Sequence, residues 1–166
     1  MVRHVLFDAL IGNTDRHQDN WGLLWNSETN KARMAPVFDN GTSLGHEISP
    51  LSMRNFDDAA LRRYVGRGAH HIRWCFGESR VQHADMVRRL CGPDWGLREH
   101  ITALLSAFNP NIVTDIITCM TNFDIRIPLS AARAEFACRL IVNAPLSTPS
   151  RSPLPADIVC AVGIDQ

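Results

Sequence analysis

A polar segment between two apolar regions limits most strongly what this sequence can fold into. The segment reads GNTDRHQDN, residues 12–20. Before it, residues 2–11 place apolar side chains at the spacing of one helix face, and Gly12 interrupts that pattern. After it, the runs WGLLW and ARMAPVF flank NSETNK, whose composition is typical of a hairpin turn. The sequence therefore predicts a charged loop between a helix and a β-hairpin.

The rest of the chain predicts a mainly helical protein. FDNGTSLGHEISPLS, residues 38–52, is typical of an extended loop. Helices are expected at residues 55–65, 79–92, 96–108, 111–123 and 129–142, the first of them capped by Asn55. The predicted fold class is mainly α with a small β-hairpin (α+β). Residues 1–142 form the expected domain, and the Pro/Ser-rich residues 143–166 are predicted to be a flexible tail.

The bulk composition argues against several classes of function. The chain has 166 residues with 17 basic and 17 acidic side chains, so no overall positive field favours nucleic acid or an anionic membrane. No apolar run approaches the ~20 residues that span a bilayer. Five cysteines without C-x-x-C spacing predict reduced thiols. These features predict a cytoplasmic protein without direct nucleic-acid or membrane partners.

Three polar residues have the spacing of a phosphoryl-transfer site. Asp15 and Asn20 form a D-x-x-x-x-N pattern, which in protein kinases supplies a base for the substrate hydroxyl and an amide ligand for Mg²⁺. Mg²⁺ needs further oxygen ligands because it prefers octahedral coordination. Asp39 follows the second predicted strand, where a hairpin would return it to the loop. These three residues are therefore the candidate catalytic and metal-binding set.

The same residues carry a resemblance to a known family. LIGNTDRHQDNWGLL followed by MAPVFDNGTSLG closely resembles the C-terminal catalytic region of the HipA-like serine/threonine kinases. The likeness is specific over residues 5–46 and general over the helices that follow. The DRHxxN loop of phosphatidylinositol 3/4-kinases is a looser match. The resemblance implies a protein-kinase-like C-terminal lobe that uses ATP and Mg²⁺.

The resemblance also implies a role for each site residue. Asp15 looks like the general base, and Asn20 and Asp39 look like the ligands of Mg²⁺. Arg16 would neutralise phosphate charge, and His17 would fix the loop by a hydrogen bond. Members of the family phosphorylate serine or threonine of a protein substrate, and many are toxins of toxin–antitoxin pairs held by a helix-turn-helix antitoxin.

A kinase also needs an N-lobe, whose strand lysine pairs with the phosphates. The single lysine, Lys31, lies in the predicted hairpin, after the loop. The expectation is a C-lobe lacking its N-lobe, inactive alone and completed by a partner polypeptide or a fused segment. The alternatives are a non-catalytic pseudokinase or partner-binding remnant and, less favoured, a lipid kinase lobe. His70 and His71, near Cys75, are predicted to be ordinary surface or partly buried side chains.

Overall fold

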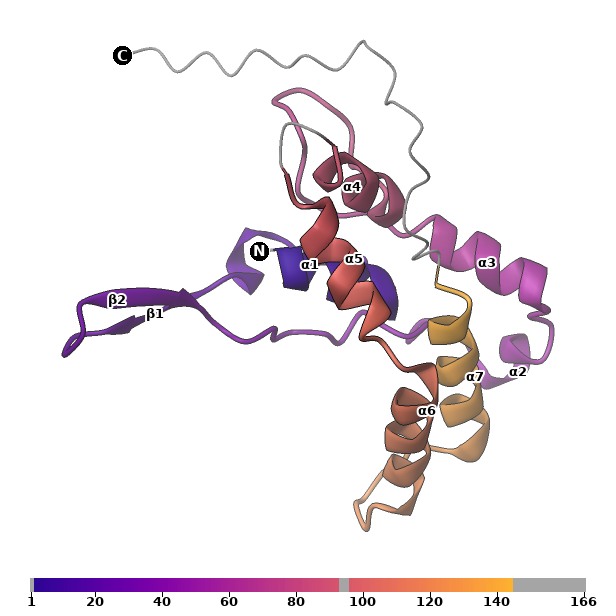
Figure 1. Ribbon diagram of the computed structural model, residues 1–166. Coiled ribbons are helices and arrows are strands. Elements are labelled where there is room, and N and C mark those ends of the chain that lie inside the picture. The colour runs from indigo at the N-terminus through magenta and orange to yellow at the C-terminus, as the bar shows by residue number, and fades with distance from the viewer. Residues whose placement is uncertain (1, 93–95, 145–166) are drawn as a thin grey trace.

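Short helices around a long polar loop make up most of the molecule (Figure 1). The structure is a computed structural model, and it describes residues 2–92 and 96–144. The helices are α1 (Val2–Ile11), η1 (Gln18–Asn20), α2 (Pro50–Met53), α3 (Asp58–Gly66), α4 (His83–Leu90), α5 (Arg98–Ser106), α6 (Pro110–Cys119), η3 (Met120–Asn122) and α7 (Ala131–Val142). The strands β1 (Leu23–Asn26) and β2 (Lys31–Met34) form an antiparallel pair. The mainly α fold class with one hairpin is confirmed, whereas most of the predicted tail lies outside the described residues.

Two element boundaries differ from the predictions for local reasons. The second strand ends at Met34 instead of running on to Phe38, because Pro36 has no N–H to donate to a ladder. The predicted cap at Asn55 is wrong. The Asn55 N–H instead donates to the Ser52 carbonyl after α2, and the Asp57 side chain caps α3 by accepting from the Ala60 N–H.

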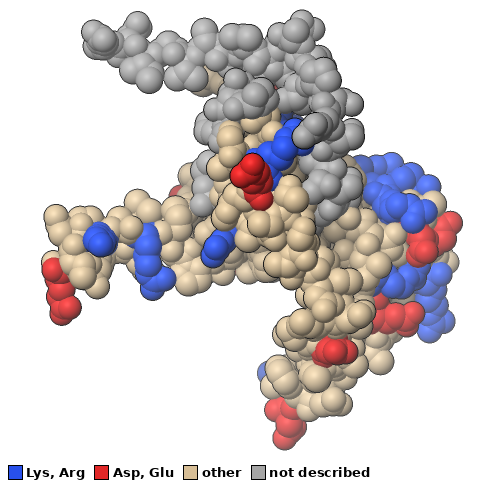
Figure 2. All heavy atoms as spheres, viewed as in Figure 1, with Lys and Arg blue, Asp and Glu red and all other residues tan. Residues whose placement is uncertain are grey.

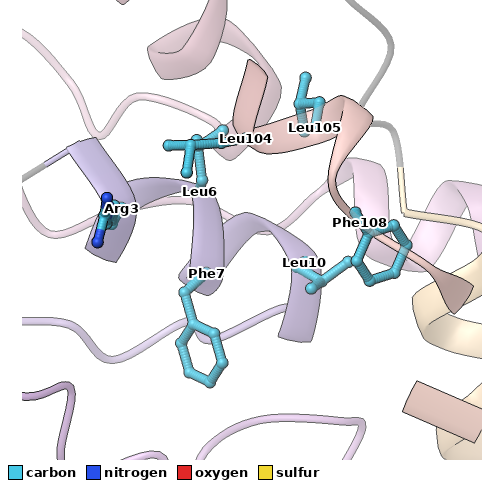
Figure 3. A pocket seen from close by; sticks show the side chains of 7 residues that line it. All are labelled: Arg3, Leu6, Phe7, Leu10, Leu104, Leu105 and Phe108. Atoms are coloured by element: carbon cyan, nitrogen blue, oxygen red, sulfur yellow. The ribbon is translucent and has the colours of Figure 1, made fainter. Parts of the chain in front are cut away.

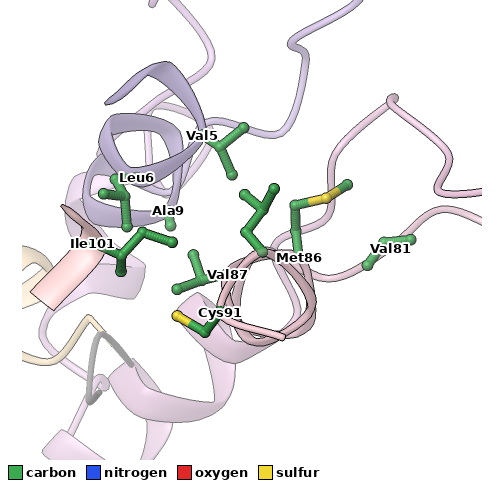
Figure 4. Close-up of a cluster of buried hydrophobic side chains, with 9 residues drawn as sticks. Val5, Leu6, Ala9, Val81, Met86, Val87, Cys91 and Ile101 are labelled. Carbon is green, nitrogen blue, oxygen red and sulfur yellow. The ribbon is translucent and has the colours of Figure 1, made fainter. Parts of the chain in front are cut away.

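Three buried apolar clusters hold the helices together. The first joins α1, α4 and α5 and includes Leu6, Val87 and Ile101 (Figure 4). The second joins α3 to α7, and the third joins α6 to α7. Because α7 takes part in two of the clusters, it forms the central support of the helical part. The first cluster fixes α1, from which the polar loop begins.

Helix α7 also holds the segment that follows Asp39. The Arg133 guanidinium donates to the carbonyls of Gly45 (2.7 Å) and Ile48 (2.6 Å). Gly45 has φ of +66°, and a Cβ there would lie 2.8 Å from the Phe136 ring. This position therefore requires glycine, both for its backbone and for its close approach to α7.

Charged side chains are unevenly spread over the surface. Figure 2 shows many of them around α3, whereas the projecting arm that contains α6 is mostly uncharged on the visible face. Within residues 2–92 and 96–144, no single helix has the length and apolar character to span a membrane; α5 and α6–η3 meet that test only together, bent by 55°. Cys91, Cys119 and Cys138 are free thiols, but Cys75 is disulfide-bonded, so the prediction of reduced thiols is wrong for Cys75.

Candidate active site

The polar loop is attached to α1 by a buried asparagine. The Asn13 side chain donates to the Asp8 carboxylate (3.1 Å), on the buried side of α1. Its carbonyl oxygen accepts from the Asp15 N–H (3.1 Å) and from the Thr42 hydroxyl (2.9 Å). One side chain therefore connects the helix, the loop and the segment after Asp39.

Arg16 lies in the interior of the protein, although the family resemblance predicts that it contacts phosphate. Its side chain is 0% exposed, with Nη2 2.8 Å and Nε 3.0 Å from the Asp8 carboxylate. Nη1 donates to the Phe38 carbonyl, and Nη2 also donates to the Asn40 side chain (2.7 Å). A guanidinium used in this way does not fit the predicted phosphate contact. Arg16 instead ties both halves of the site to α1.

The two predicted metal ligands lie side by side. The Asn20 amide donates to Asp39 Oδ2 at 2.7 Å, and its carbonyl oxygen accepts from the His17 N–H at 3.1 Å. Asn20 is buried, whereas Asp39 is exposed and has φ of +54°. A left-handed conformation is uncommon outside glycine and occurs most often at turns and functional sites. The hairpin thus brings together residues that are 19 positions apart.

Asp15 and His17 lie at the rim of the loop. The His17 ring accepts from the Asp19 N–H (3.3 Å) and so caps η1. The Asp15 side chain is half exposed, and its Oδ1 lies 3.4 Å from Nε2 of His71. The His17 and His71 rings meet edge to face with centroids 6.3 Å apart. The candidate base therefore has an imidazole partner that the sequence did not indicate.

The donor types at Asn20 and Asp39 suit Mg²⁺, which takes carboxylate and amide oxygens. The Asp39 carboxylate is exposed to a ligand, whereas Asn20 would have to turn its amide, whose N–H faces Asp39 and whose oxygen accepts from the His17 N–H. Mg²⁺ in nucleotide sites is held by one or two protein side chains, with phosphates and water completing the octahedron. No group of three or more His, Cys, Asp or Glu side chains suited to a metal occurs among the described residues.

A pair of buried histidines lies behind the loop. The prediction that His70 is a surface or partly buried side chain is therefore wrong. His70 and His83 are 0% and 1% exposed, and their rings meet at right angles with centroids 4.3 Å apart. No ring nitrogen of either makes a hydrogen bond to the described residues. Burial lowers the pKa of His70 to about 4, helped by the charge of Arg16. Burial and His70 together lower the pKa of His83 to about 3, against the opposing effect of Asp8 and the Asn13 backbone.

This pair should make the protein less stable in acid. Each ring must be neutral to stay buried, whereas in the unfolded chain it takes up a proton near pH 6.5. The two histidines therefore do not lower the free energy of unfolding above pH 6.5, and they lower it progressively as the pH falls from 6.5 towards 3. We expect a loss of about 2 kcal/mol per histidine at pH 5, measured by urea unfolding at pH 7.5 and 5.0. His70→Phe should reduce this dependence and the exposed His100→Gln should not; equal losses in all three proteins would contradict the assignment.

An apolar pocket lies apart from the loop. It has a volume of about 230 Å³ and is formed by α1 and α5, with Phe7, Leu10 and Phe108 in its walls (Figure 3). None of the five site residues predicted from the sequence lines it. This pocket is therefore separate from the polar loop.

Comparison with known proteins supports a kinase-like chain. No family model matches the sequence. The chain is 49% identical over 61 residues to a Helicobacter pylori protein, serine/threonine-protein kinase CtkA, across 34% of this chain and 19% of that protein. The crystal structure of the H. pylori proinflammatory kinase CtkA matches with a TM-score of 0.63 at 19% identity, covering 86% of this chain and 50% of that one. The chain therefore shares the fold of about half of that kinase and is homologous to CtkA over a short stretch.

Proposed function

We propose that the chain is the C-terminal catalytic lobe of an ATP-dependent serine/threonine kinase of the HipA-like type. The observation that supports this most strongly is the 2.7 Å contact between Asn20 and Asp39, beside a loop that presents Asp15. The alternative is that these polar residues only cap a helix or form a turn. Such a structural role requires neither the Asn20–Asp39 contact nor the left-handed backbone at Asp39. The homology to a serine/threonine kinase supports the same reaction class.

In this proposal the protein groups divide the work of phosphoryl transfer. Asp15 accepts the proton of a serine or threonine hydroxyl as that oxygen attacks the γ-phosphorus. Asn20 and Asp39 would hold Mg²⁺, which when bound would neutralise the charge of the ATP phosphates. Arg16 and His17 act by positioning the loop, since their polar atoms contact protein groups. The chemistry therefore depends on a few correctly placed oxygen atoms.

The proposal includes partners that would complete the enzyme. Leu23 and Trp25 on the hairpin are 70% and 61% exposed, and apolar surface of this kind suits a covering segment. We propose that an N-lobe, from a partner polypeptide or a fused segment, packs there. A protein substrate and a helix-turn-helix antitoxin are the further partners that the family resemblance suggests.

Calorimetry of Mg²⁺-dependent ATP binding tests the proposed site. Wild type should bind, and Asp39→Asn should bind at least about 10-fold more weakly, because the change removes the anionic ligand. Asp19→Asn is the matched control, since this aspartate lies in the same loop with its side chain 78% exposed. Equal binding by Asp39→Asn and wild type would refute the metal site. No binding by wild type would favour a non-catalytic binding module.

A further inference from the structure

We propose that His71 is a positioning residue for Asp15, which orients the carboxylate by directing Nε2–H at Oδ1. The inference rests on the proposed function and adds a residue to that site. It starts from the 3.4 Å separation between His71 Nε2 and Asp15 Oδ1. Both side chains are partly exposed, at 27% and 50%, so the pair is accessible to solvent and to a substrate.

The segment that carries His71 is fixed by its neighbours. Backbone hydrogen bonds join His70 to Val81 and Gly68 to His83, both at 2.9 Å, on either side of a bridge between Ala69 and Gln82. Successive residues of an extended segment point to opposite sides. The His70 ring is buried against His83, and its neighbour His71 faces the loop. Burial of one histidine thereby sets the position of the other.

The geometry leaves the carboxylate free to act as a base. Among the described residues, the contact of the Asp15 carboxylate is between its Oδ1 and Nε2 of His71, so Oδ2 can face a hydroxyl. When the hydroxyl oxygen bonds to phosphorus, its O–H bond breaks and the proton moves to the carboxylate. The carboxylic acid then releases this proton to water, while His71 keeps Oδ1 in place. Asp15 is thereby restored to its anionic form.

Nitrogen NMR of the full chain labelled at histidine tests the pairing without any assay of activity. Asp15→Asn should shift the ring signals of His71, identified by their loss in His71→Ala. Asp19→Asn should leave those signals in place, because Asp19 contacts His17 instead. If the His71 signals are the same in Asp15→Asn and wild type, the pairing is refuted.

Single-turnover transfer from labelled ATP, measured on the chain assembled with its N-lobe, tests the role. His71→Ala should slow transfer at least about 10-fold with ATP affinity within twofold of wild type. His71→Gln should recover part of the loss, because its side-chain amide can also donate to the Asp15 carboxylate. The exposed His46→Ala is the control. Wild-type transfer rates in His71→Ala would overturn the proposal, whereas failure of wild type to bind Mg²⁺ and ATP would overturn the proposed function and leave the NMR result to decide the pairing.

Discussion

Replacing Arg16 with alanine should lower the free energy of unfolding by about 3–5 kcal/mol. The change leaves the Asp8 carboxylate buried without its cation, at a position that is 0% exposed. It also removes the donors to the Phe38 carbonyl and to Asn40. Urea unfolding of the two proteins measures the difference. Arg63→Ala, an exposed arginine on α3, should change the free energy by less than about 0.5 kcal/mol.

A double replacement separates the charge pair from the packing. Asp8→Leu together with Arg16→Met should be much more stable than Arg16→Ala, because replacing both members of a buried pair by apolar groups is often neutral. The double variant should still bind Mg²⁺ and ATP poorly, since the Arg16 donors to the Phe38 carbonyl and to Asn40 are then lost. A loss below about 1 kcal/mol for Arg16→Ala would contradict the supporting role assigned to this pair.

Asp15→Ala should abolish phosphoryl transfer in the assembled enzyme and leave folding almost unchanged. General bases contribute roughly 10²- to 10⁴-fold to such rates, and the Asp15 side chain is half exposed and outside the apolar clusters. Incorporation of labelled phosphate into a general protein substrate measures the rate, and thermal unfolding measures the fold. Asp19→Ala is the control within the same loop. A fully active Asp15→Ala protein would remove this residue from the role of base.

The sequence contained the local features of the fold and the outline of the site. Apolar spacing over residues 2–11 was sufficient to predict α1, and the polar run between two apolar runs was sufficient to predict the hairpin. The approach of Asn20 to Asp39 follows from that hairpin, so it was predictable as well. These signals are short in range, which is why a single sequence carries them.

The supporting contacts were not predictable in the same way. Arg16 was assigned to phosphate because of its neighbours in the chain, but its position depends on Asp8, Phe38 and Asn40, which only the folded chain brings together. One signal in the sequence could have indicated this pair. Asp8 is an acidic residue on the apolar face of a predicted helix, and a buried acid needs a polar or charged partner. His71 reaches Asp15 across 56 positions, and no periodicity encodes that distance.

The connection of Asp8 and Asn13 to both halves of the site also determines what can be transplanted. A designer who grafts residues 12–20 onto another scaffold would move the reactive groups without the side chains that orient them. A graft needs at least the residues from Asp8 to Thr42, because they include the helix turn, the loop, the hairpin and the segment that returns to Asn13. For protein engineering, this stretch should therefore be moved as one piece. Its ends are set by the residues that hydrogen-bond to Asn13 and not by the ends of the polar motif at residues 12–20.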